Sequence, residues 1–147
     1  MKYIVTLDSG AKEINSLING TRSMIIFGTD VRCFPYGNIE EGDTLYFAGN
    51  DNTSEIKAKA IVSSVFNSFR LSEEESYEII IRNQDKLQLP DDLFYKYAGK
   101  RYLVLIEVCK VEELKLSHIN INNFPGAGDW LLMRTFSDLS VPDLRIA

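Results

Sequence analysis

The chain has 147 residues, a formal net charge of −5 and 45% hydrophobic residues, which suits one folded domain with a sizeable core. An acidic chain is not a globally basic nucleic-acid clamp, although a local basic groove is compatible with this charge. No apolar run approaches the roughly 20 residues of a membrane span, and 2 cysteines make no disulfide framework. We therefore expect a cytoplasmic protein without membrane contact.

The N-terminal segment predicts a strand followed by a helix with a sharp end. Residues 3–7 form a β-branched run that is typical of a strand. Asp8 and Ser9 are N-cap residue types, and apolar residues then recur at helical spacing over residues 11–18. Gly20 ends this helix, because glycine adopts the left-handed conformation after a helix without steric cost.

The next part of the chain predicts strands separated by polar turns. Residues 31–34 form a short apolar run before Pro35 and suit a sheet edge or a turn. The turn at residues 49–52 is expected to join two strands into a hairpin. Further strands are predicted at residues 24–27, 44–48 and 56–66.

Two helices are predicted in the second half of the chain. Ser72 and Glu75 have the spacing of a capping box. The helix that follows is expected to bury one face, formed by Tyr77, Ile80 and Ile81. A shorter helix begins after Pro90 and ends at Gly99, with Leu93, Phe94 and Tyr97 facing inward.

Two more strands complete the pattern. Residues 102–108 are apolar on both faces, which predicts a central strand covered on each side. Residues 130–133 predict a last strand or an anchoring segment, and residues 137–147 form a C-terminal tail. No repeat or linker divides residues 1–147, so we expect a single domain of α+β class. A small curved β-barrel with helices inserted between strands is the natural solution, because closure removes exposed sheet edges.

Three short motifs resemble the ASCH family of PUA-like domains. In that family a helix ends at a Gly-x-(Lys/Arg)-(Thr/Ser) turn, and an (Ile/Val)-x-x-Gly-Asp segment later enters a barrel strand. The matching segments here are Gly20-Thr21-Arg22-Ser23, Ile39-Glu40-Glu41-Gly42-Asp43, and the late strand at residues 99–108. The resemblance covers roughly residues 3 to 112. It implies a PUA-like pseudo-barrel with a cleft beside the first helix, proposed to hold RNA, a nucleotide or a modified base.

The resemblance does not carry an enzymatic activity onto this chain. One branch of the family hydrolyses the acyl group of acetylated cytidine with a lysine and a threonine from the turn after the first helix. By position, these residues correspond to Arg22 and Ile25. Ile25 is no nucleophile, and an arginine stays protonated and is no general base near neutral pH.

The turn formed by Gly20, Thr21, Arg22 and Ser23 is the first candidate binding site. A guanidinium at this position can hold a phosphate or a base edge through two donors, and the two hydroxyl groups add further donors. The alternative is a helix C-cap followed by a solvated turn, with Arg22 complementing the helix dipole. Both interpretations remain open.

Three further residues are candidates for ligand contact. Lys57 shares one face of its strand with Lys59 and would line a phosphate track with it, although the solvated face of a barrel strand is the favoured interpretation. Phe47 follows Tyr46 on one strand, so one of the two is expected in the core and the other at the cleft. Trp130 either stacks on a base, a contact worth roughly 1 to 3 kcal/mol, or closes the barrel end.

The sequence thus favours a binding module for RNA, a nucleotide or a modified base. A nucleoside-directed, amidohydrolase-like enzyme is an alternative, but no catalytic constellation is recognisable. A protein-interaction module, with a protein partner or a second copy, is the other alternative; its sign would be an exposed apolar patch on the helix at residues 91–97. The motifs call for no metal or cofactor.

Overall fold

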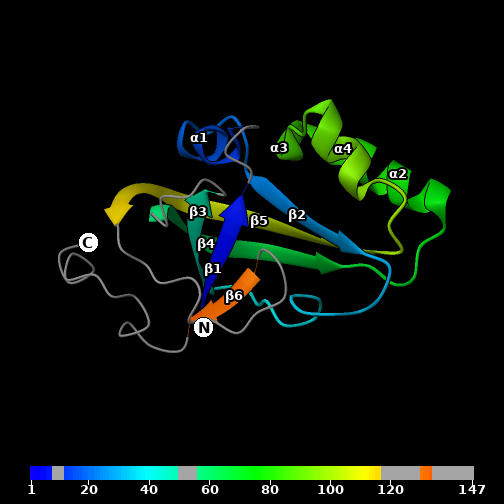
Figure 1. The fold of residues 1–147 in the computed structure, drawn as a ribbon, viewed down its shortest axis with the longest axis horizontal. Helices are drawn as coiled ribbons and strands as arrows, with labels where there is room; N and C mark the ends of the chain where they lie inside the picture. Colours follow the sequence, from blue (N-terminus) through cyan, green and yellow to red (C-terminus); the bar gives the residue numbers. More distant parts are fainter. Residues whose placement is uncertain (8–11, 50–55, 117–129, 134–147) are drawn as a thin grey trace.

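A computed structural model describes residues 1–7, 12–49, 56–116 and 130–133. Six strands form one sheet in the order β2-β5-β4-β3-β1-β6 (Figure 1). The strands are β1 (Lys2–Leu7), β2 (Met24–Thr29), β3 (Thr44–Gly49), β4 (Ile56–Asn67), β5 (Tyr102–Leu116) and β6 (Trp130–Met133). The helices are α1 (Glu13–Ile18), α2 (Glu73–Arg82), α3 (Gln84–Leu87) and α4 (Asp91–Tyr97).

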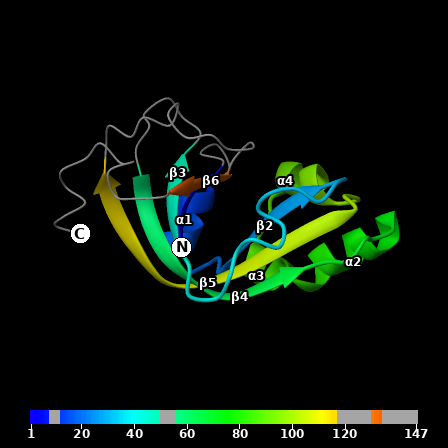
Figure 2. The ribbon, with the colours of Figure 1, turned by 90° about the horizontal axis from the view of Figure 1, so that it is seen from below.

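The sheet is mostly antiparallel and strongly curled. The predicted hairpin is confirmed, since β3 and β4 pair antiparallel, whereas β1 and β3 pair in parallel. The register between β4 and β5 shifts at three places, and such bulges bend strands and increase their twist. Figure 2 shows these two strands bending along their length, with β1, β3 and β6 at one end and the helices α2 to α4 at the other.

The α+β class and the curled sheet with inserted helices are therefore confirmed. The sheet forms a half-barrel: over the described residues, β2 and β6 are its two edges and do not pair with each other. The sequence-based expectation of a closed sheet is thus met only in part. One edge, β2, is lined by the small helices, which is a second way of shielding a strand edge.

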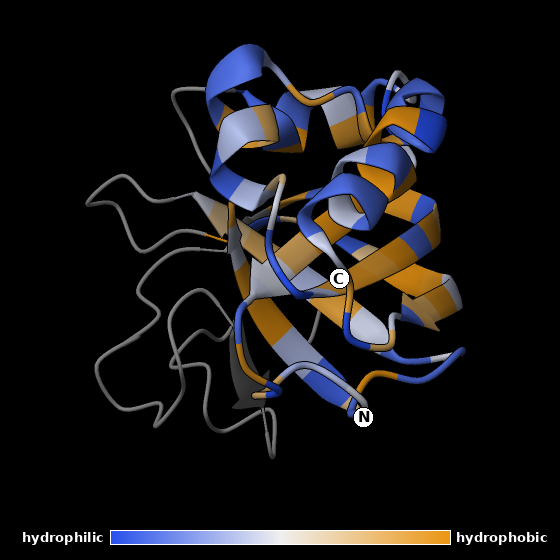
Figure 3. Cartoon of the chain, turned by 90° about the vertical axis from the view of Figure 1, so that its right-hand side faces the viewer, coloured by the Kyte–Doolittle hydropathy of each residue, from blue (hydrophilic) through white to orange (hydrophobic). Residues whose placement is uncertain are grey.

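Hydrophobic residues fill both faces of the sheet at its centre. One core lies inside the curl and contains Ile25, Phe47 and Val104 together with Ile14 and Leu17 from α1. The second core lies between β2, β5 and the helices α2 to α4. Figure 3 shows apolar residues concentrated on the strands and polar residues on the outward surfaces of the helices. Two cores explain why β5 is apolar on both faces, as predicted.

The local signals at helix ends are confirmed where the structure describes them. The Ser72 hydroxyl accepts a hydrogen bond from the Glu75 amide, and the Glu75 carboxylate accepts one from the Ser72 amide, which completes the capping box. Gly20 and Gly99 both have positive φ angles, of 82° and 91°, and end their helices as expected.

Two details of the helices differ from the predictions. Ile81 is 60% exposed, whereas its neighbour Ile80 is fully buried, so the predicted inward face of α2 is wrong at Ile81. The short helix α3, over Gln84–Leu87, was not predicted. It begins where Asn83 ends α2, and it buries Leu87 in the second core.

Some expectations fall outside the described residues. The N-cap residues Asp8 and Ser9 and the tail at residues 137–147 are among them, and the prediction of a single domain over residues 1–147 stays a prediction. Within the described ranges, no helix is both long and apolar enough to cross a membrane.

Candidate functional site

The turn at residues 20–23 is held between α1, α3 and β5. The Arg22 amide donates to the Ser16 carbonyl of α1 at 3.0 Å. The Ser23 amide donates to the Lys86 carbonyl of α3 at 3.0 Å, and the Ser23 carbonyl accepts from the Val108 amide at 2.9 Å. The turn therefore connects three elements that are distant in sequence, and its backbone is fixed.

Arg22 is buried, with only 3% of its surface exposed. Its Nη1 donates to Oε1 of Glu13 at 2.5 Å, and its Nε donates to the Met24 carbonyl at 2.7 Å. Its Nη2 is also buried but has no hydrogen-bond partner among the described residues. The sequence predicted Arg22 in a solvated turn or at a ligand. In the structure its side chain is buried and bonded to neighbouring residues, so it is part of the fold.

The buried ion pair decides what this site can attract. Glu13 lies on α1 with its side chain 9% exposed, so its carboxylate compensates the charge of Arg22 at short range. A compensated guanidinium has little net attraction for a phosphate, but its remaining N–H donor still requires an acceptor. The arrangement suits a neutral polar group, such as a carbonyl on a base edge.

The other predicted residues lie in different environments. Gly20 and Thr21 are exposed and Ser23 is half-buried at the turn. Phe47 has no exposed surface and packs in the core inside the curl, and its contact with a ligand stays a prediction. Tyr46 is buried as well, so neither of these neighbours faces solvent in this structure.

Lys57 and Trp130 stay predictions for different reasons. Lys57 is half-buried on β4, and its neighbour Lys59 lies 3.6 Å from the Glu112 carboxylate of β5. That pairing agrees with the solvated strand face that the alternation favoured. Trp130 is paired with Val5 through the backbone of β6 and β1, but its side chain lies outside the described part of the structure.

The residues that a catalytic mechanism would need do not come together at the turn. Ile25, at the position of the family's threonine, is 1% exposed and lies in the core. Both cysteines are free thiols, with Cys109 exposed and Cys33 half-buried. Among the described residues, no group of three or more histidine, cysteine or carboxylate side chains is arranged to hold a metal ion.

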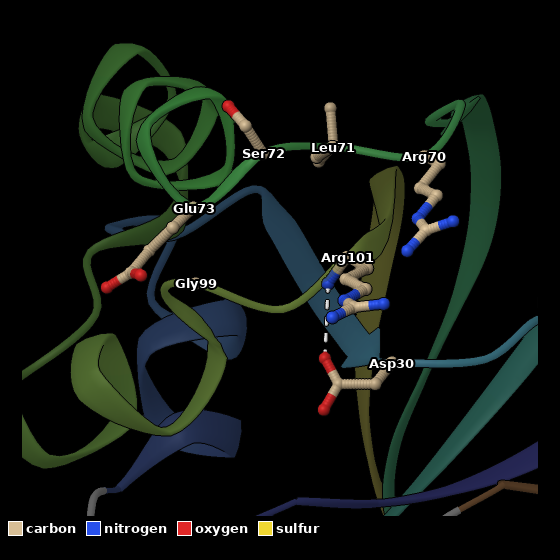
Figure 4. Close-up of a pocket in the computed structure, with 7 residues that line it drawn as sticks. All are labelled: Asp30, Arg70, Leu71, Ser72, Glu73, Gly99 and Arg101. Carbon is tan, nitrogen blue, oxygen red and sulfur yellow. Dashed lines mark hydrogen bonds between the residues drawn. The ribbon is translucent and has the colours of Figure 1, made fainter.

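The structure also brings together two arginines that sequence reasoning did not connect. Arg70 follows β4 and Arg101 precedes β5, and both line a cavity of about 610 Å³ at the far end of the sheet from α1. Figure 4 shows both guanidinium groups directed into the same space. We call this cavity the arginine cavity; it is lined by Asp30, Arg70, Leu71, Ser72, Glu73, Gly99 and Arg101.

A third arginine, Arg32, contacts two aromatic rings, one of them on the first residue of β5. The guanidinium of Arg32 lies 5.6 Å from the ring centre of Tyr36 and 5.4 Å from that of Tyr102. Tyr102 directly follows Arg101, and the Tyr36 hydroxyl donates to the Ser68 carbonyl. These contacts hold a cation on an aromatic surface, and none of the three residues lines the arginine cavity.

The curled sheet with helices inserted between its strands defines a PUA-like domain. Comparison with solved structures identifies the particular fold as that of the ASCH domain. The ASCH protein of Zymomonas mobilis superposes with a TM-score of 0.68 at 7% sequence identity, over 95% of this chain and 93% of that chain.

Two variant structures of the same bacterial protein agree with this match. A tyrosine-to-phenylalanine variant gives a TM-score of 0.63 at 10% identity, over 91% of each chain. A serine-to-alanine variant gives 0.63 at 8% identity, over 91% of this chain and 89% of that chain. No family model and no curated protein sequence matches this chain. The resemblance found in the sequence is thus confirmed at the level of the fold.

Proposed function

We propose that this protein binds RNA, a nucleotide or a modified base through its ASCH fold, with the turn at residues 20–23 as the place of recognition. The observation that carries the proposal is the Nη2 atom of Arg22, a buried donor without a partner among the described residues. Buried donors in folded proteins are nearly always satisfied, so this one calls for an acceptor.

The chemistry of the turn supports a base edge as that acceptor. Glu13 compensates the charge of Arg22, so recognition depends on hydrogen bonding more than on net charge. Thr21 is exposed and Ser23 is half-buried beside it, and their hydroxyl groups can donate to or accept from the same ligand. Gly20 has no side chain to obstruct the approach of a planar ring.

The experiment is a titration of the full chain with nucleosides, modified nucleosides and short RNAs at low salt. Arg22→Lys is the informative variant, because a lysine can still pair with Glu13 but has no planar second donor. Thr21→Ala changes an exposed side chain at the turn and preserves the fold. Arg82→Lys is the matched control, since Arg82 is exposed and pairs only at the surface of α2 with Glu78.

We expect Arg22→Lys to weaken binding of the preferred base by about tenfold, as befits loss of one buried hydrogen bond to a charged group. Thr21→Ala is expected to weaken it less, and Arg82→Lys not at all. If both turn variants bind every nucleoside and RNA as tightly as the unmodified chain, the turn is not the recognition site.

A protein-interaction module is the second candidate, and one observation favours it. Phe66, Phe69 and Ile81 are large apolar residues that are 43%, 66% and 60% exposed. The predicted sign on α4 is weaker, because Leu93 is buried there and Tyr95 is the exposed aromatic residue. Light scattering of the full chain, compared with a Phe69→Ser variant, tests for self-association through these residues.

A further inference from the structure

We propose that the arginine cavity binds the dianion of a phosphate monoester. This goes beyond the proposed recognition of a base at Arg22 and does not depend on it, because the two sites share no residue. They also lie at opposite ends of β2, with the turn before Met24 and Asp30 after Thr29. Five residue steps along a strand span roughly 17 Å, so one mononucleotide cannot reach both.

The backbone holds Arg70 and Arg101 as neighbours. The Leu71 amide donates to the Arg101 carbonyl at 2.8 Å. Ser68, which is fully buried, donates its amide to the Leu103 carbonyl at 3.0 Å and accepts the Leu103 amide on its hydroxyl at 2.9 Å. The segment after β4 therefore runs beside the start of β5, and the two arginines are placed together before any ligand arrives. Such preorganisation lowers the entropic cost of binding.

The two guanidinium groups of the arginine cavity are not directly paired within the described part of the chain, although two carboxylates, of Asp30 and Glu73, also line the cavity. Both arginines are exposed, and their guanidinium groups make no ion pair or hydrogen bond there. Asp30 accepts the Arg101 amide at 3.4 Å on Oδ1, while its Oδ2 lies 3.9 Å from Nζ of Lys100. Figure 4 shows the Glu73 carboxylate directed away from both guanidinium groups.

The amides at the first turn of α2 are not the source of the proposed anion binding. Its Ser72 and Glu75 amides are already used by the capping box, and Glu73, Glu74 and Glu75 bring negative charge to this turn. The attraction for an anion therefore comes from the two guanidinium groups. The lining of the cavity carries two positive and two negative side chains, so recognition depends on the unpaired donors of the two guanidinium groups and not on an excess of positive charge.

Two guanidinium groups match a dianion better than a single negative charge. Each presents two parallel N–H donors that fit a phosphate in bidentate geometry. A phosphate monoester carries nearly two charges at neutral pH, with a second pKa of about 6, whereas an internal phosphodiester carries one. The cavity also has the size of ordinary ligand pockets, so the monoester can bear a substituent.

The test is calorimetric titration of the full chain with inorganic phosphate, adenosine 5′-monophosphate, adenosine, and a short RNA with either a 5′-phosphate or a 5′-hydroxyl group. The variants are Arg70→Gln and Arg101→Gln, with Arg82→Gln as the matched control on an exposed arginine outside the cavity. Because neither cavity side chain supports the described fold, both variants are expected to melt like the unmodified chain, which circular dichroism verifies.

We expect adenosine 5′-monophosphate to bind and adenosine not to bind here. Each cavity variant should weaken the binding about tenfold or more, with Arg82→Gln within twofold of the unmodified chain. Affinity should rise as pH increases through about 6, where the monoester takes its second charge; the titratable groups that face the two arginines in the cavity are Asp30 and Glu73.

The different ligands separate the sources of the phosphate. Preference for the 5′-phosphorylated RNA supports an RNA end, preference for the mononucleotide supports a free nucleotide, and equal affinity for inorganic phosphate supports free phosphate. The proposal is overturned if none of the phosphate-bearing ligands shows saturable binding, or if binding is unchanged in both cavity variants. Neither result depends on Arg22, so failure here leaves the base-recognition proposal standing.

Discussion

Arg22 and Glu13 form a buried ion pair that joins the turn before β2 to the helix α1, with Nη1 and Oε1 2.5 Å apart. The pair fixes a guanidinium at the turn that the ASCH resemblance singled out. It also makes the turn a structural element as well as a candidate site, so tests of stability and of binding must be kept apart.

Breaking this ion pair on one side is expected to be costly. Arg22→Met leaves the Glu13 carboxylate buried without its guanidinium and should lower the free energy of unfolding by about 3–5 kcal/mol. The double variant Glu13→Gln with Arg22→Met should cost less than the sum of the two single variants, because neither charge is then left alone. Urea denaturation measures all of these values.

The control for the ion pair is its exposed counterpart on α2. Arg82 and Glu78 lie 2.8 Å apart, with side chains 68% and 61% exposed. Arg82→Met should change the free energy of unfolding by at most about 1 kcal/mol, because water screens this pair. If Arg22→Met and Arg82→Met lowered the free energy of unfolding equally, the buried Arg22–Glu13 pair would have no special structural role.

Two buried tyrosines predict a loss of stability at alkaline pH. Burial, followed by the charges of Asp43 and Glu40, raises the pKa of Tyr3, and burial raises the pKa of Tyr46. The folded chain therefore holds these protons more tightly than the unfolded chain. Their contribution to stability is present below about pH 10, the pKa of a free tyrosine, and is lost as pH rises through the higher folded pKa.

Denaturant unfolding between about pH 8 and 11 checks this prediction. Tyr46→Phe removes one of the two titrating hydroxyl groups and keeps the ring, so the decline above about pH 10 should become shallower. Lys2 acts in the opposite direction, because burial and then the charge of Lys59 lower its pKa, but it is only slightly buried. An unchanged slope in the Tyr46→Phe variant would mean that the hydroxyl is not the group that titrates.

Gly28 is expected to tolerate no side chain, for reasons of space. A Cβ atom there would lie 3.0 Å from Leu103, 3.2 Å from Tyr97 and 3.4 Å from Lys100. Gly28→Ala should lower the free energy of unfolding by about 1–3 kcal/mol, as overpacking does. Gly20→Ala is the comparison, because a Cβ at Gly20 meets nothing within 4 Å and only the positive φ angle is strained. If Gly28→Ala were as stable as the unmodified chain, β2 and α4 would be able to move apart.

The sequence was most informative where a signal is local. The capping box at Ser72 and Glu75, the glycine stop at Gly20 and the alternation along β4 each depend on neighbouring residues, and all three are confirmed. The partner of Arg22 could not be predicted, because Glu13 faces it only through the rotation of α1 against β2. Without knowledge of the contact between Arg22 and Glu13, a helix C-cap with a solvated Arg22 was a reasonable interpretation of the sequence.

The arginine cavity shows the same limit over a longer distance. Arg70 and Arg101 are 31 positions apart, with three helices between them, and become neighbours only because β4 and β5 pair. The available signal in the sequence was that one arginine follows a predicted strand by a few residues and the other directly precedes a later one.

The last prediction uses two neighbouring isoleucines as each other's control. Ile80 is fully buried in the core beneath α2, whereas Ile81 is 60% exposed. Ile80→Ala should lower the free energy of unfolding by about 2–5 kcal/mol, because the helix cannot close the cavity that is left. Ile81→Ala should change it by at most about 0.5 kcal/mol, the ordinary range for a surface position. Chemical denaturation of both variants tests whether α2 packs on the sheet with Ile80 inward and Ile81 outward. Similar losses of unfolding free energy at the two positions would mean that Ile81 also packs against a surface, in a second copy or in another part of the chain.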